Sequence, residues 1–131
     1  MKNLQSRYGD LAAKNIPYDE EVEIEDNFVK TLREFVEKNL STVKPRDLDG
    51  VFYMSTSSFI RKLRAVTGKT PSMFIKLIRL QTSKELLKNT DDSISEIVYK
   101  IGFSSPEYFS NQFRELFGLT PTEYRNGSKP S

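Results

Sequence analysis

A repeat at a spacing of 50 residues limits the fold of this chain more than any other feature of its sequence. In each copy, two apolar residues four positions apart are followed by a glycine and then by Thr-Pro. Apolar residues four apart lie on one face of a helix, glycine often ends a helix, and Thr-Pro often begins the next one. Each copy is therefore predicted to contain a helix before the glycine and another after it. The matched pairs are Phe59 with Phe109, Leu63 with Phe113, Gly68 with Gly118, Thr70 with Thr120, Pro71 with Pro121 and Phe74 with Tyr124.

The second copy, residues 93–124, has the clearer pattern. Ser93 and Glu96 have the spacing of a capping box, which predicts the start of one helix. Gly102 then predicts a tight turn, and Ser105 the N-terminus of the next helix. Two helices joined by a tight turn form a helix-turn-helix unit. The side chains predicted to face its core are Ile94, Ile97, Val98, Ile101, Phe109, Phe113, Leu116 and Phe117.

The first copy is less regular. Asp26 is the predicted N-cap of a helix that ends before Pro45, residues 48–52 are predicted to form a short helix, and one of residues 55–58 should cap the helix that follows. The predicted core positions here are Phe28, Leu32, Phe35, Val36, Leu40, Phe59, Leu63 and Val66. Upstream of the turn the spacing is 49 residues, which implies one extra turn residue in the second copy. The pairs that show this are Leu48 with Ile97 and Ser55 with Ser104.

These patterns predict an all-α fold of about seven helices, in which two helix-turn-helix subdomains are joined by a long linker helix. The linker helix carries apolar residues on several sides, which predicts burial between two neighbours. A length of 131 residues suits one such duplicated domain. The predicted boundaries are residues 1–25 for an acidic linker or tail, 26–69 for the first subdomain, 70–89 for the linker helix, 90–126 for the second subdomain and 127–131 for a disordered tail.

Composition excludes several classes of chemistry. The chain has no cysteine and no histidine, so it can form no disulfide, no Cys/His zinc site and no Ser/His/Asp triad. No metal or cofactor is expected. It has no apolar run long enough to span a bilayer and no signal-peptide pattern, so we expect it to make no membrane contact and to be cytoplasmic.

Charge is distributed unevenly. Residues 1–27 carry three basic and seven acidic side chains, a net of −4, whereas residues 28–131 carry 17 basic and 11 acidic side chains, a net of +6. Residues 50–84 contain seven basic side chains and no acidic one. A local basic block is typical of a protein that binds a polyanion, although a solvated basic face has the same composition.

Each predicted helix after the turn has an outward polar stripe. A single helix fits the major groove of DNA, which is roughly 12 Å wide, and the groove faces the same side again roughly 34 Å further along. The linker helix would span roughly 28 Å at about 1.5 Å per residue. The sequence therefore predicts that a monomer places its two recognition helices in successive major grooves of one duplex. The two stripes are Ser57, Ile60, Arg61 and Arg64 in the first copy, and Glu107, Ser110, Asn111 and Arg114 in the second.

Side-chain chemistry assigns roles within these stripes. Arg61 can hold O6 and N7 of a guanine with its two-pronged guanidinium group, Asn111 can bridge an adenine, and Glu107 suits a cytosine amino group. Ser57 and Ile60 are the remaining predicted base contacts. Basic groups and helix N-termini bind phosphates, which fix register without reading sequence. The predicted phosphate contacts are Lys62, Arg64, Lys69, Lys76, Arg79, Ser105, Ser110 and Arg114.

The chain resembles the DNA-binding domain of the AraC/XylS transcription regulators over residues 28–125. The resemblance implies two helix-turn-helix subdomains that bind promoter or operator DNA and regulate transcription, with RNA polymerase as a further partner. Residues 74–80, together with the acidic tail before Asp26, are similar to output domains that end hybrid two-component proteins, which implies sensor or receiver domains outside this chain. The motifs that carry the resemblance are Ile97-Val98, Gly102 to Pro106, Tyr108 to Ser110, Phe113-Arg114, Gly118, Thr120-Pro121 and Tyr124-Arg125, with Met54-Ser55, Phe59, Arg61 to Leu63 and Thr67-Gly68 in the first copy.

The first copy departs from the family at three positions. Asp49 replaces a small residue at a helix crossing, Gly50 lies inside the short helix, and Tyr53 occupies a turn position that is usually small or polar. A buried carboxylate is costly unless it is paired or turned outward. The short helix is therefore expected to be shifted or irregular.

Two other functions fit parts of the sequence. A helical interaction module could dock an acidic protein partner through the basic block. An enzyme could use Glu85, Asp91, Asp92 and Glu96, but three of these residues are predicted to lie in a loop or a cap, without metal-binding spacing.

Overall fold

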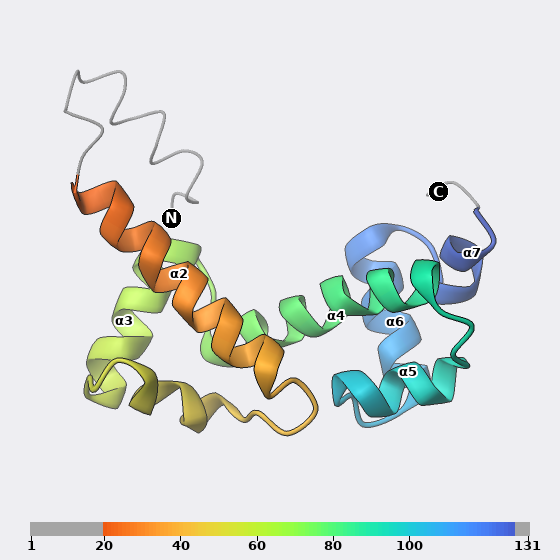
Figure 1. The fold of residues 1–131 in the computed structure, drawn as a ribbon, viewed down its shortest axis with the longest axis horizontal. Helices are drawn as coiled ribbons and strands as arrows, with labels where there is room; N and C mark the ends of the chain where they lie inside the picture. Colours follow the sequence, from red (N-terminus) through yellow and green to blue (C-terminus); the bar gives the residue numbers. More distant parts are fainter. Residues whose placement is uncertain (1–19, 128–131) are drawn as a thin grey trace, which may run out of the picture. The chain divides into compact units, whose positions relative to one another are not determined.

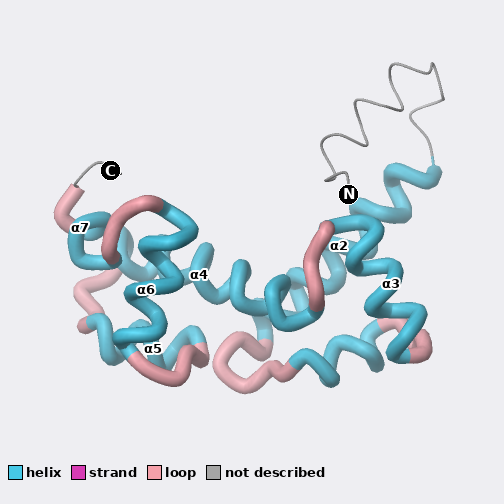
Figure 2. Tube along the Cα trace, turned by 180° about the vertical axis from the view of Figure 1, so that it is seen from behind, coloured by secondary structure: helices cyan, strands magenta, loops and turns pink. Residues whose placement is uncertain are grey.

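The computed structural model describes residues 20–127 and places side chains from residue 26 onward. In this range the chain is entirely helical, without a strand, as predicted (Figures 1 and 2). The predicted tails lie outside the described residues except at residues 20–25 and 127. The elements are α2 (Glu20–Lys38), the 3-10 helix η1 (Pro45–Val51), α3 (Thr56–Thr67), α4 (Pro71–Asn89), α5 (Ile94–Ile101), α6 (Pro106–Phe117) and α7 (Pro121–Arg125).

The described residues divide into two compact units. The first contains residues 20–38 and 44–75, and the second contains residues 39–43 and 76–127. The predicted long helix is confirmed as α4, which contributes its first turn to the first unit and the rest to the second. This division explains why α4 is apolar on several sides, because it supplies core residues to both units. Its buried apolar residues are Phe74, Ile75, Ile78, Leu80 and Leu87.

The core of the first unit comes from α2, η1, α3 and the start of α4. The buried face predicted for α3 is confirmed, since Phe59, Leu63 and Val66 are all buried. Phe52 stacks on Phe28 with ring centroids 4.6 Å apart, which packs the end of η1 against α2. The other buried side chains are Phe28, Leu32, Val36 and Leu48, whereas Phe35 is half-buried. Leu40, predicted for this core, is half-buried against the core of the second unit instead.

Two predicted helix boundaries in this unit are wrong. α2 begins at Glu20, six residues before the predicted cap at Asp26. The segment between them lacks an apolar stripe, but glutamate forms helices well and acidic side chains are favoured near a helix N-terminus. The short helix predicted at residues 48–52 is a 3-10 helix that begins at Pro45, a residue well suited to a first helical position. The expectation that this helix is shifted or irregular is therefore confirmed.

The three unusual residues of the first unit are accommodated without a buried charge. Asp49 is half-exposed and accepts a hydrogen bond from the Thr56 hydroxyl at 2.6 Å. Gly50 has open space where a Cβ would lie. Tyr53 has a positive φ of 54° and is 96% exposed. A tyrosine in this backbone region is strained by roughly 1 kcal/mol.

The second unit has a core of aliphatic and aromatic side chains. Phe113 forms edge-on or tilted ring contacts with Phe109, Phe117 and Tyr124. Leu116, predicted to be buried, is 46% exposed, because Phe109 and Phe113 already fill the covered side of α6. The buried cluster of the second unit consists of Leu80, Leu87, Ile97, Val98, Ile101, Phe109 and Phe113, with Ile94 and Phe117 partly buried against it.

The predicted helix ends of the second unit are confirmed. Ser93 and Glu96 form the capping box of α5, and Thr120 and Glu123 form that of α7. Gly102 ends α5 with φ 85°, and its N–H donates to the carbonyl of Val98 at 3.0 Å.

The structure revises the alignment of the two turns. Ser55 caps α3 and Ser105 caps α6, so the two caps are 50 residues apart and the predicted pairing of Ser55 with Ser104 is wrong. Tyr53 and Gly102, which are 49 apart, both have positive φ. The extra residue of the second copy therefore lies between Gly102 and Ser105.

Arginine side chains bind carbonyl groups at or just after the ends of two helices. Arg79 donates from Nε to Leu40 O and from Nη2 to Val43 O, both at 3.0 Å. Arg125 donates to the carbonyls of Leu87, Thr90 and Asp92. The Leu87 carbonyl lies in the last turn of α4, where carbonyls lack an intrahelical partner, and the other acceptors lie in the segments after α2 and α4.

Within the described part of the chain, none of the helices combines the length and the apolar surface that crossing a membrane requires.

Candidate nucleic-acid interface

The two helices that follow the turns, α3 and α6, each bury one face and expose another. In α3, Ser57, Arg61 and Arg64 are exposed, and Ile60 is 39% exposed. In α6, Glu107, Asn111 and Arg114 are exposed, while Ser110 is half-buried. The buried residues of α3 and α6 fix these orientations, because each helix is anchored by phenylalanine at equivalent positions, Phe59 and Phe109. The two predicted stripes thus reach the surface, except for the partly covered Ser110.

The charges of the two exposed faces differ. α3 carries three basic side chains and no acidic one, whereas α6 carries one basic and two acidic side chains. The N-terminal turn of α3 is also uncharged, so no carboxylate within α3 offsets the partial positive charge of its N-terminus. A polyanion would therefore be attracted more strongly to α3 than to α6.

One lysine within α3 and another just after it are half-buried. The Lys62 ammonium lies 5.1 Å from the centroid of the Phe28 ring, in cation–π range. Lys69, just after α3, is half-buried, and its backbone N–H donates to the Thr67 hydroxyl at 3.1 Å. Both lysines add positive charge to α3 and its C-terminal end.

Two residues predicted to bind phosphate have partners inside the second unit. The Lys76 ammonium donates to Gln112 Oε1 at 2.7 Å, and Gln112 Nε2 in turn donates to Glu115. Arg79 is bound to the carbonyls of Leu40 and Val43, and burial lowers the pKa of its guanidinium group. These donors hold helices together, so we leave Lys76 and Arg79 out of the proposed DNA surface. The sequence could not show this, because the acceptors are backbone and amide groups distant along the chain.

Ser105 is the N-cap residue of α6. Its hydroxyl accepts the Tyr108 N–H at 3.1 Å, as an N-cap does. Glu107, in the first turn of α6, would repel a phosphate at this helix end. The phosphate contact predicted for Ser105 stays a prediction.

Sequence reasoning identified Tyr53 as unusual but did not predict its conformation. Its ring is almost fully exposed in the turn immediately before α3, on the same structural unit. The repeat contained the signal for this conformation. Tyr53 is 49 residues before Gly102, and a glycine in that turn indicates a positive φ at the equivalent position of the first copy. Asp49 was also missed as a partner of Thr56 at the first turn of α3.

Comparisons with known proteins are consistent with this arrangement. The family described as "Helix-turn-helix domain" matches residues 50–127. Histidine kinase P4 of Formosa agariphila is 41% identical over 73 residues, which cover 56% of this chain and 5% of that protein. The transcriptional activator RhaS of Enterobacter sp. (strain 638) is 37% identical over 81 residues, covering 62% of this chain and 29% of that protein. The chain thus spans less than a third of the length of either relative.

Solved structures show the same fold. The DNA-binding domain of AdpA, solved in complex with a target DNA, has a TM-score of 0.68 and 27% identity, covering 75% of this chain and 89% of that one. An AraC-type transcriptional regulator from Chromobacterium violaceum has a TM-score of 0.72 and 27% identity, covering 77% of this chain and 91% of that one.

Proposed function

Because this chain belongs to the helix-turn-helix domain family of AraC-type regulators, we propose that it binds specific double-stranded DNA sequences as part of a bacterial transcription regulator. The observation that carries the proposal is the exposed face of α3, which presents basic side chains without an acidic one on a helix fixed by its buried side. A helix of this kind can enter a major groove and contact base edges.

Within this proposal, Arg61 reads sequence. It is exposed in the middle of α3, where its planar group can donate two hydrogen bonds to one guanine. Ser57 and Ile60 contact neighbouring base edges or a thymine methyl group. Arg64, Lys62 and Lys69 bind phosphates and make affinity depend on salt.

α6 has a smaller electrostatic part. Asn111 and Glu107 are the proposed base contacts, and Arg114 and Ser110 the proposed phosphate contacts. Because α6 has a net negative charge, we propose that it contributes less affinity than α3. We propose further that the two helices occupy successive major grooves.

Relatives support a regulatory role within a larger protein. RhaS is a transcriptional activator, and the AdpA domain was solved with DNA. The match to a histidine kinase is consistent with an output domain attached to a sensor. We propose that this domain acts on promoter DNA in the cytoplasm together with RNA polymerase. The family is one of DNA-binding regulators, and we propose no catalytic activity.

Selection of bound sites from random duplexes tests this function. The expected result is an enriched motif with two conserved blocks about one helical turn apart, one block containing a guanine that Arg61 reads. No enrichment over the starting pool would refute sequence-specific binding. A single block would refute the use of two grooves but leave the role of α3 intact.

A further inference from the structure

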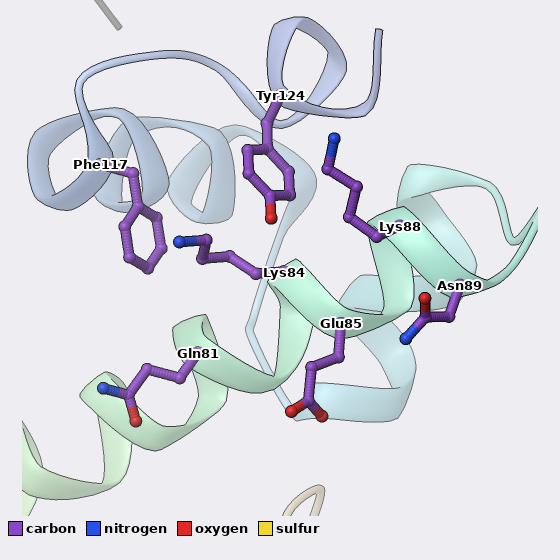
Figure 3. A pocket seen from close by; sticks show the side chains of 7 residues that line it. All are labelled: Gln81, Lys84, Glu85, Lys88, Asn89, Phe117 and Tyr124. Carbon is purple, nitrogen blue, oxygen red and sulfur yellow. The ribbon is translucent and has the colours of Figure 1, made fainter. Parts of the chain in front are cut away.

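A pocket of about 430 Å³ lies within the second unit, between the second half of α4, the end of α6 and α7 (Figure 3). Its walls include Lys84 and Lys88 from α4, Phe117 from α6 and Tyr124 from α7. None of the residues in the exposed stripe of α6 lines it. The pocket is therefore distinct from the surface that we assign to DNA.

The aromatic walls hold two positive charges beside the cavity. The Lys84 ammonium lies 4.5 Å from the ring centroid of Phe117 and 5.3 Å from that of Tyr124. The Lys88 ammonium lies 4.7 Å from the Tyr124 centroid. Cation–π contacts of this kind favour a fixed position for an ammonium group without neutralising its charge.

Neither ammonium has an acidic partner among the described residues. Glu85 also lines the pocket, but its carboxylate extends away from the two rings (Figure 3). The two ammonium groups thus give the pocket a positive charge that attracts a carboxylate. The rings of Phe117 and Tyr124 give it an apolar surface against which a neighbouring side chain can pack.

We propose that this pocket binds an acidic peptide segment of a partner protein. One carboxylate of the segment lies between Lys84 and Lys88, and an adjacent apolar side chain lies against Phe117 and Tyr124. The lining residues of α4 extend from Gln81 to Asn89, which is about 12 Å along the helix at about 1.5 Å per residue. An extended peptide covers this length with three to four residues at about 3.3 Å each, whereas a small anion would occupy only one end.

Such a contact would let the chain hold DNA and a protein at the same time. The acidic partner would meet α4, α6 and α7 at the pocket, whose lining includes no residue of α3 or of the exposed stripe of α6. Because the pocket and the proposed DNA surface share no residue, substitutions can test peptide binding and DNA binding separately.

The test measures binding of a fluorescein-labelled peptide of alternating glutamate and leucine to the full chain by fluorescence anisotropy at low salt. A peptide with glutamine in place of glutamate is the control ligand. We expect the acidic peptide to bind at least about tenfold more tightly, and the double variant Lys84→Gln/Lys88→Gln to lose this preference. The variant Lys30→Gln/Lys38→Gln removes the same charge from exposed positions of α2 and should keep the preference.

Three results would overturn the proposal. The double variant in the pocket could keep the parent's preference for the acidic peptide. Acetate at the same concentration of carboxylate could displace the peptide completely, which would identify a small-anion site. The double variant could also lose as much affinity for a selected duplex as for the peptide, which would make Lys84 and Lys88 phosphate contacts. Circular dichroism of each variant serves as the control for folding, and the helical content should equal that of the parent.

Discussion

Replacement of Gly102 by alanine tests how the second helix-turn-helix unit is held together. Gly102 has φ 85°, and an added Cβ would lie 2.8 Å from Ser41 O, 2.9 Å from Ser41 Cα and 3.0 Å from Leu40 O. These neighbours are backbone atoms, so no side chain can rotate away to make room. Residues 40 and 41 belong to the segment after α2, residues 39–43, which is part of the second unit.

The expected cost has two sources. The left-handed backbone conformation costs an alanine roughly 1 to 2 kcal/mol, and crowding against backbone in a packed site costs typically 1 to 3 kcal/mol more. We therefore expect Gly102→Ala to lower the free energy of unfolding by about 2 to 5 kcal/mol. Urea unfolding followed by circular dichroism measures this change.

Gly50→Ala is the matched control. No atom lies within 4 Å of its ideal Cβ, and its φ is not positive. Alanine should be neutral or stabilising here by up to about 1 kcal/mol, because it reduces the freedom of the unfolded chain. Equal effects of the two substitutions would refute the steric reasoning at Gly102.

Three further substitutions have expected outcomes. Tyr53→Gly should raise the free energy of unfolding by about 0.5 to 1 kcal/mol, because it removes a strained φ from an exposed residue; a loss of stability in urea would contradict this. Arg125→Met should lower it by about 2 to 4 kcal/mol, since three carbonyls lose their donor, and an unchanged urea midpoint would contradict this. The hydrogen bond from Lys100 lowers the pKa of Asp92, so the pair should stabilise the fold at neutral pH and lose this contribution as pH falls through the folded pKa of Asp92. Asp92→Asn should flatten the acid limb of a stability curve recorded against pH, and a curve parallel to that of the parent would contradict this.

Local signals in the sequence predicted a large part of the fold. Ser93, Thr120 and the glycines after α3, α5 and α6 end or begin helices through contacts within a few residues. Such contacts are encoded by short patterns, so the helix starts at Ile94 and Pro121 were predictable. The start of α2 was not, because a segment rich in glutamate lacks the apolar periodicity that identifies a packed helix.

Tertiary contacts decided which residues of the candidate site are available. The sequence places Arg79 and Arg61 in the same basic block, yet Arg79 binds two carbonyls almost 40 residues away while Arg61 is exposed. The pocket beside Lys84 was equally hidden, since Phe117 and Tyr124 come from other helices. Periodicity indicates which face of a helix is polar, but it does not show which polar groups already have partners.

The central claim is that α3 reads DNA sequence through Arg61. It is tested most directly by equilibrium binding of the parent, Arg61→Ala and Arg61→Lys to a selected duplex and its single-base variants, at several salt concentrations. Loss of a two-pronged contact to guanine, about 1 to 3 kcal/mol, predicts that Arg61→Ala binds about 5- to 150-fold more weakly and no longer distinguishes the guanine. Arg61→Lys should keep the salt dependence of the parent but lose the base preference, because lysine keeps the charge without the planar fork. Unchanged affinity and base preference in Arg61→Ala, together with parental affinity that does not vary with salt, would contradict the claim.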